Sequence, residues 1–181
     1  SNQYRDTADG KFQGNLDIRW LKNDHFLFIS NDDKPFKFVR GNGEEIKPRA
    51  IETDGGSIPR LLWGVKGLSP WGFAPAYIVH DFLFVQNQCK TRGYQDYTFD
   101  ESATIMAEAL KAIMEKDKES RSYFAFNAIL AGVKTPIAKQ LWEKGKCRES
   151  KFSFMMPASR GSDSKPVEPE MGELVMTISF E

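Results

Sequence analysis

Two adjacent ionisable residues, His80 and Asp81, stand inside an otherwise apolar segment that runs from Pro75 to Val85. Burying such a pair is costly unless both groups are paired or bound to a ligand. Imidazole titrates near neutral pH, which suits His80 to general-base catalysis. In a structural alternative, His80 caps a backbone carbonyl and Asp81 pairs with an arginine. We expect a functional His80 to lie at the base of a cleft that solvent can reach.

A glycine-containing turn, Thr53-Asp54-Gly55-Gly56-Ser57, precedes this segment. Gly55 and Gly56 allow backbone atoms to approach a ligand closely, and Asp54 adds a carboxylate. These residue types are compatible with a calcium loop that uses carbonyl oxygens, or with Ser57 as a nucleophile beside a base. They are equally typical of a strand-to-helix turn in which Ser57 caps the helix. Both interpretations remain open at the level of sequence.

Asp100 and Glu101 begin the next helical pattern. Acidic residues are favoured at helix N-termini by the helix dipole, so their presence needs no catalytic reason. One of them would come near the imidazole of His80 only if the two helices pack antiparallel. Their role therefore depends on that packing.

The elements that must position these residues change character near Thr53. Before it, apolar and polar residues alternate, as in half-buried strands, and residues 41–43 (Gly-Asn-Gly) signal a hairpin. The expected strands cover about 16–20, 25–29, 36–38 and 46–51, with Pro48 suggesting an edge or a bend. Together they predict an antiparallel β-meander.

After Thr53 the spacing becomes helical. Helices are expected at about 60–63, 75–85, 100–116, 120–132 and 137–144, and a closing strand at 174–180. The polar first ten residues are expected to fray. We therefore predict a single α+β domain, 1–181. Its parts are an N-terminal antiparallel β-meander (about 12–52), a helical bundle that carries the His-Asp helix (53–147), and an extended tail with a C-terminal strand (148–181).

Composition narrows the possible partners. The chain has 181 residues with 25 basic and 25 acidic side chains, so it lacks the basic excess of most nucleic-acid binders, and no nucleic-acid partner is expected. No run of about eighteen apolar residues predicts a transmembrane segment, so we expect a soluble protein. The two cysteines, Cys89 and Cys147, would pair in an oxidising compartment and stay thiols in the cytosol.

Two motifs carry a resemblance to a known family. The turn reads T-D-x-x-S-I-P-R, from Thr53 to Arg60, and the helix reads H-D-F-L-F, from His80 to Phe84. In this order they resemble the bacterial and phage family called domain of unknown function 1353. The resemblance covers about residues 46–110, with a weaker echo at 127–145, and marks Asp54 and Arg60 as binding residues. Where the family has an aspartate in the next helix, this chain has Ala103, and Asp100 lies one turn earlier on the same face.

The His-Asp helix is more distantly similar to the catalytic helix of phospholipases A2. That resemblance implies that His80 activates a water and that Asp81 binds calcium with carbonyls of Gly55 and Gly56. It also implies that Asp100 or Glu101 orients the imidazole. The chain lacks the disulfides and the C-x-G-x-G loop of those enzymes.

Three functions follow as hypotheses. The first is a calcium-assisted esterase that acts on a lipid or similar ester. The second is a hydrolase built from Ser57, His80 and Asp54. The third is a non-catalytic phage or cell-envelope protein with a structural His-Asp pair. The corresponding locations are the bacterial cytoplasm, a phage particle, or the periplasm if a leader has been removed.

Overall fold

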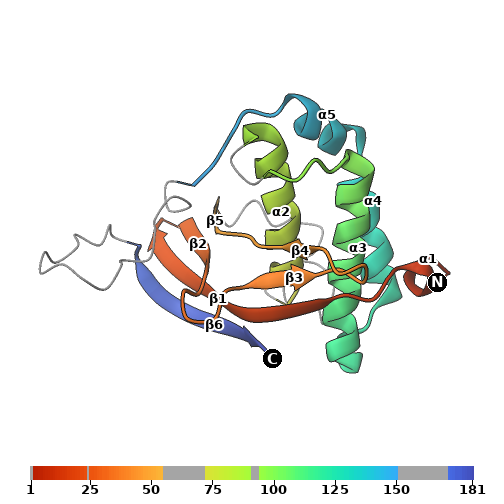
Figure 1. The fold of residues 1–181 in the computed structure, drawn as a ribbon, viewed down its shortest axis with the longest axis horizontal. Helices are drawn as coiled ribbons and strands as arrows, with labels where there is room; N and C mark the ends of the chain where they lie inside the picture. Colours follow the sequence, from red (N-terminus) through yellow and green to blue (C-terminus); the bar gives the residue numbers. More distant parts are fainter. Residues whose placement is uncertain (1, 24, 55–71, 91–93, 151–170) are drawn as a thin grey trace, which may run out of the picture.

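The computed structural model describes residues 2–23, 25–54, 72–90, 94–150 and 171–181, apart from the side chains of Asp54 and Ser120 (Figure 1). An N-terminal antiparallel sheet is followed by helices and a C-terminal strand, which confirms the predicted α+β class. The elements are α1 Asn2–Asp6, β1 Lys11–Lys22, β2 His25–Ser30, β3 Lys37–Val39, β4 Glu45–Ile46, β5 Ala50–Asp54, α2 Ala74–Cys89, α3 Phe99–Lys116, a 3-10 turn Lys118–Ser120, α4 Tyr123–Val133, α5 Pro136–Lys144 and β6 Glu173–Phe180.

The sheet is organised around β1, its longest strand among the described residues. β1 pairs antiparallel with β2, β3 and β6, and the strand order is β4-β3-β1-β2-β5. Consecutive strands are therefore not always neighbours, as they would be in a simple meander. The closing strand is confirmed, and it returns to the first strand of the sheet, where Leu16 lies opposite Ile178.

The single strand expected at 46–51 is divided in two. β4 pairs with β3, whereas β5 pairs with β2, so the two pieces extend different strands. Pro48 lies between them and has no backbone N–H with which to continue a ladder. The expected bend at Pro48 is therefore a change of pairing partner.

Gly14 marks the point where β1 changes partner. Residues 11–13 pair with β3, and the pairing with β2 begins at Leu16. Gly14 has φ +80°, and a Cβ there would lie 2.0 Å from the carbonyl oxygen of Pro35. Glycine alone meets both demands, because it has no Cβ and tolerates positive φ. This close approach allows the sheet to curl.

The core lies between the sheet and the helices. Leu16, Ile18 and Phe28 are buried on the sheet and belong to one cluster with helical residues such as Val79 and Ile105. α2 packs against β5 and α3, and α3 packs against β1 and α4, while α5 packs against α2. Figure 1 shows that α2, α3 and α4 lie beside the sheet and that α5 lies near the C-terminal end of α2. The His-Asp helix is thus held from several sides.

The N-terminal residues are not frayed as expected. α1 forms there because Tyr4 is buried, with its ring edge-on to Tyr123 and Phe126 at centroid distances of 5.0 and 5.1 Å. The hydroxyl of Tyr4 also donates to Glu115 at 2.5 Å. Local composition predicted fraying, but these contacts come from α3 and α4 and are invisible in the first ten residues.

The main helices follow the predicted pattern with shifted ends. α2 extends to Cys89 and ends at Lys90, which has φ 47° and donates its N–H to the carbonyl of Gln86. α3 begins at Phe99, because Thr98 caps it. The short helix expected at 60–63 lies outside the described residues. Among the helices that are described, none has both the length and the apolar character needed to span a membrane.

Candidate functional site

α2 carries the candidate site on one of its faces. Proline in the first turn suits a helix start, where its missing N–H costs nothing. Tyr77, His80, Asp81 and Phe84 follow at intervals of three, one and three residues, so they share one face of the helix. The sequence pattern indicates the His-Asp pair there, whereas Tyr77 counts only as one of the apolar residues of that segment.

His80 is buried and incompletely bonded. His80 is 7% exposed, and its Nε2 atom is buried without a hydrogen-bond partner. The ring packs against Phe84 at a centroid distance of 4.8 Å. Burial lowers the pKa of His80 to about 4, so the imidazole is neutral at neutral pH. The expectation that solvent reaches the ring is not met at Nε2. The structural alternative, in which the imidazole bonds to a backbone carbonyl, is not met at this atom either, because it has no hydrogen-bond partner.

Asp81 is half-buried on the same face. Burial raises its pKa to about 7. No hydrogen bond or ion pair joins its carboxylate to another residue in the described part of the chain, so the arginine of the structural alternative is not found there. The neighbouring Tyr77 hydroxyl is buried without a partner, and its pKa is raised by burial and by the charge of Asp81.

Unpartnered polar atoms gather on this helix. Within the described residues, four buried side-chain atoms lack a partner, and three of them belong to α2: those of Tyr77, His80 and Gln86. Native structures pair most buried polar groups, so each exception calls for an explanation such as a ligand or an ion. α2 is therefore the place in the described structure where a missing partner is best indicated.

The glycine turn can be followed only to its first residues. Asp54 ends β5, with its backbone opposite His25, and β5 packs against α2. The Asp54 side chain and the predicted site residues Gly55, Gly56, Ser57 and Arg60 lie outside the described residues. His25, the second histidine, is paired with Glu52 at 3.3 Å.

Asp100 and Glu101 are exposed at the start of α3. The Thr98 hydroxyl accepts the backbone N–H of Glu101 at 3.1 Å and lies 3.2 Å from its carboxylate, which is a capping arrangement. Neither acid has a hydrogen bond to His80 among the described residues. Ala103 is buried whereas Asp100 is exposed, so Asp100 does not occupy the buried position of Ala103. Their orienting role stays a prediction.

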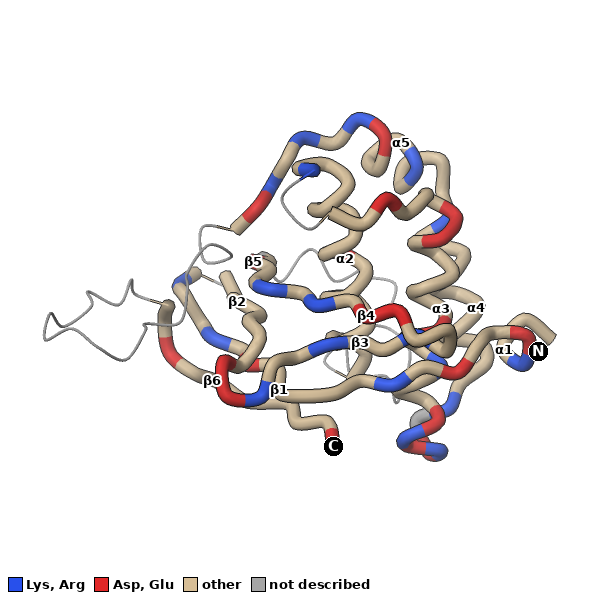
Figure 2. The backbone as a smooth tube through the Cα atoms, viewed as in Figure 1, with Lys and Arg blue, Asp and Glu red and all other residues tan. Residues whose placement is uncertain are grey.

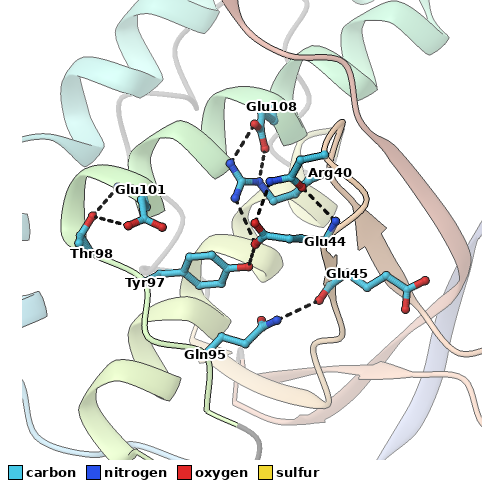
Figure 3. Close-up of polar contacts among 9 residues, drawn as sticks. Arg40, Glu44, Glu45, Gln95, Tyr97, Thr98, Glu101 and Glu108 are labelled. Carbon is cyan, nitrogen blue, oxygen red and sulfur yellow. Dashed lines mark hydrogen bonds and ion pairs between the residues drawn. The ribbon is translucent and has the colours of Figure 1, made fainter.

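A second polar cluster, shown in Figure 3, is fully bonded. Arg40 donates to both carboxylate oxygens of buried Glu108, at 2.8 and 3.1 Å, and lies 3.4 Å from Glu44. The Tyr97 hydroxyl donates to Glu44 at 2.5 Å. The pKa of Tyr97 rises to about 12 through burial and this bond, and the hydroxyl in turn lowers the pKa of Glu44. This cluster ties the β3–β4 hairpin to α3 and leaves no group free, so we interpret it as structural.

The two cysteines form a disulfide, which resolves the alternative left open by the sequence. Cys89 ends α2 and Cys147 follows α5. Together with Glu149 they make the one grouping of three potential metal ligands found in the described part of the chain. Because disulfide sulfurs are not thiolates, this grouping lacks the donors that a zinc site needs.

Comparison with known proteins identifies a family. A family model described as "Protein of unknown function (DUF1353)" matches residues 33–126, just over half of the chain. The match includes β3, β4, β5, α2 and α3, and so contains both the His-Asp face and the Arg40 cluster. It lies outside β1, α5 and β6. No curated protein and no solved structure matches the chain.

Proposed function

The chain belongs to the DUF1353 family, and we propose, from the side chains of α2, that it is a calcium-assisted ester hydrolase. The observation that carries this proposal is the unpartnered Nε2 of buried His80, on the same helical face as the desolvated carboxylate of Asp81. A histidine kept for packing alone would be expected to have its buried nitrogen paired.

His80 would act as the general base. Its lowered pKa keeps the ring neutral at physiological pH, so Nε2 can accept a proton when its tautomer carries the hydrogen on Nδ1. Because Nε2 is sealed in this structure, the step requires the site to open so that a water reaches it. That water donates its proton to Nε2 while its oxygen attacks the ester carbonyl carbon. His80 then returns the proton to the leaving alkoxide oxygen, which yields an acid and an alcohol. The packing of the ring on Phe84 would hold it in place during both transfers.

Asp81 would be the cation ligand. Its carboxylate lacks a cationic partner among the described residues, and the unpartnered Tyr77 hydroxyl supplies another oxygen nearby. Oxygen donors of this kind suit a hard ion such as calcium, which takes about six to eight oxygens. Carbonyls of Gly55 and Gly56 are the further ligands that we predict from the sequence. A bound calcium would supply positive charge for the developing oxyanion.

The test uses the full chain with a soluble short-chain nitrophenyl ester and with dispersed phospholipid, each in calcium or in chelator. We expect His80→Ala to abolish turnover and Asp81→Asn to weaken calcium affinity in calorimetry. His25→Ala and Asp32→Asn are the matched controls, because Asp32 is exposed and His25 is partly exposed and paired with Glu52, so neither belongs to the proposed site. Both controls should keep turnover and calcium affinity.

Two outcomes would replace the proposal. Turnover that needs no calcium and disappears in Ser57→Ala would favour the hydrolase built from Ser57, His80 and Asp54. The absence of binding heat, of a thermal shift in millimolar calcium and of ester turnover would favour the non-catalytic binding or structural protein.

A further inference from the structure

α5 exposes apolar side chains in a fixed direction. Ile137 is 80% exposed and Leu141 is 48% exposed, and they lie four residues apart on one face. On the inner side, Trp142 is buried with its ring 4.9 Å from that of Phe84. The backbone carbonyls of Leu141 and Trp142 accept hydrogen bonds from Gln88 and Asn87 of α2. The helix is therefore anchored so that its apolar stripe faces outward.

Cations lie at both ends of this stripe, on the helix that carries it and in the segment that follows. Residues 134–148 contain five basic side chains and one acid, although the whole chain has no net charge. All five are exposed, and in the described part of the chain none forms an ion pair. Figure 2 shows Lys and Arg positions following one another along α5 and the segment after it. The basic residues are Lys134, Lys139, Lys144, Lys146 and Arg148.

The spacing places charge at both ends of the stripe. Ile137, Leu141 and Lys144 follow at intervals of four and three residues on one face of α5, and Lys134 comes just before Thr135, which caps the start of the helix. The disulfide of Cys147 with Cys89 holds the basic segment beyond α5 against the end of α2. The cations are thus part of the folded surface.

We propose that α5 and residues 145–148 form a docking surface for anionic lipid bilayers. Basic residues around outward-facing apolar side chains match such a surface, where lipid charge attracts lysines and the headgroup boundary accepts apolar groups. A nucleic acid fits less well, because its phosphates offer nothing to Ile137 and Leu141, and the aromatic ring of α5, Trp142, is buried and cannot stack on bases. The proposal does not depend on the esterase.

The experiment measures sedimentation of the full chain with vesicles of phosphatidylcholine, with and without about 30 mol% phosphatidylglycerol as anionic lipid. Chelator is present throughout so that calcium cannot bridge protein and lipid. We expect binding only to the anionic vesicles. The Lys134→Gln/Lys144→Gln/Lys146→Gln variant should bind more weakly, by about fivefold per lysine removed.

A second variant tests the apolar contribution. Ile137→Ser/Leu141→Ser should also lose most vesicle binding, because both side chains are exposed and their loss leaves the fold intact. Lys22→Gln/Lys34→Gln/Lys118→Gln and Leu174→Ser/Val175→Ser remove the same charge and a similar exposed apolar surface elsewhere, and should bind like the unaltered chain. Circular dichroism melts confirm folding of each variant.

Three results would overturn the proposal. The first is no binding to anionic vesicles by the unaltered chain. The second is binding that survives both α5 variants. The third is a combination of effects: the lysine variant binds vesicles more weakly, Ile137→Ser/Leu141→Ser binds them normally, and the unaltered chain binds RNA or an acidic polypeptide as tightly as vesicles. That combination would identify a polyanion site instead.

Discussion

The imidazole of His80 packs on the ring of Phe84, one turn further along α2, at a centroid distance of 4.8 Å and an interplanar angle of 48°. An aromatic neighbour and an unpartnered Nε2 make this an apolar environment for a polar ring. Such an arrangement is worse for stability than an apolar side chain of similar shape would be. The relationship therefore predicts that function and stability oppose each other here.

We expect His80→Phe to abolish ester hydrolysis while the free energy of unfolding stays equal or rises by up to about 2 kcal/mol. The physical reason is that phenylalanine fills the site without a buried unpaired nitrogen. Urea denaturation and ester turnover measure the two effects, with His25→Phe as the control that keeps activity. A marked loss of stability in His80→Phe would show that the imidazole serves the fold.

The dependence of stability on pH should reveal His80 and Asp81 separately. His80 has its pKa lowered from 6.5 to about 4, so the unfolded chain binds more protons in that window and stability falls as pH drops through it. The contribution is on the order of 3 kcal/mol. Asp81 has its pKa raised from 3.8 to about 7, so the folded chain binds more protons there and stability falls as pH rises through that range.

Because the two groups change stability with pH in opposite directions, one variant at each position tests them separately. Relative to the unaltered chain, His80→Gln should gain stability as pH drops from 6.5 to 4, and Asp81→Asn should gain stability as pH rises from 4 to 7. Denaturant titrations at each pH measure the differences. If the stability difference between a variant and the unaltered chain does not change with pH, burial in the folded protein does not shift the pKa of that group.

The disulfide should contribute strongly to stability. It closes a separation of 58 residues between Cys89 and Cys147, for which chain-entropy reasoning gives about 4 kcal/mol. We expect Cys89→Ser/Cys147→Ser to lower the free energy of unfolding by roughly that amount. Reductant should lower the free energy of unfolding of the unaltered chain by a similar amount. It should leave the double variant unchanged, because the sequence has no other cysteine. Equal stability with and without reductant would contradict this.

Breaking the Arg40–Glu108 pair should lower the free energy of unfolding substantially. Glu108→Leu removes the partner of a guanidinium whose pKa is raised chiefly by its hydrogen bond to Glu108. Because Arg40 would stay largely buried, we expect a loss of about 3 kcal/mol in unfolding free energy. The control is Glu45→Gln, which alters the more exposed Lys37–Glu45 pair and should cost clearly less, because solvent screens an exposed pair. Similar losses in both variants would argue against a structural lock.

Gly14 and Gly132 provide a matched pair of alanine substitutions. Gly14→Ala should destabilise the protein by about 3 kcal/mol, because it forces a side chain into positive φ and against the Pro35 carbonyl. Gly132→Ala lies inside α4 with open space around it, and should stabilise by about 0.5–1 kcal/mol. Thermal or urea unfolding measures both. A harmless Gly14→Ala would mean that β1 does not approach Pro35 so closely.

Much of the fold could be predicted from local patterns. Alternation around Leu16 and Ile18 indicated β1, the run of apolar residues indicated α2, and an apolar stripe indicated α3, because each pattern depends on neighbours a few residues away. The same patterns did not indicate the break between β4 and β5 or the burial of Tyr4, which depend on partners far along the chain.

For the candidate site, residue types determined the chemistry and packing determined its environment. The sequence by itself placed His80 and Asp81 on one helix and marked them as the groups that needed partners. Only the tertiary structure decided that Nε2 of His80 is sealed and unpaired, that Cys89 meets Cys147, and that Arg40 meets Glu108 across 68 residues. Helix and strand periods are set by adjacent peptide units, whereas burial and long-range pairing are set by how whole elements pack, and no short stretch of sequence contains that information.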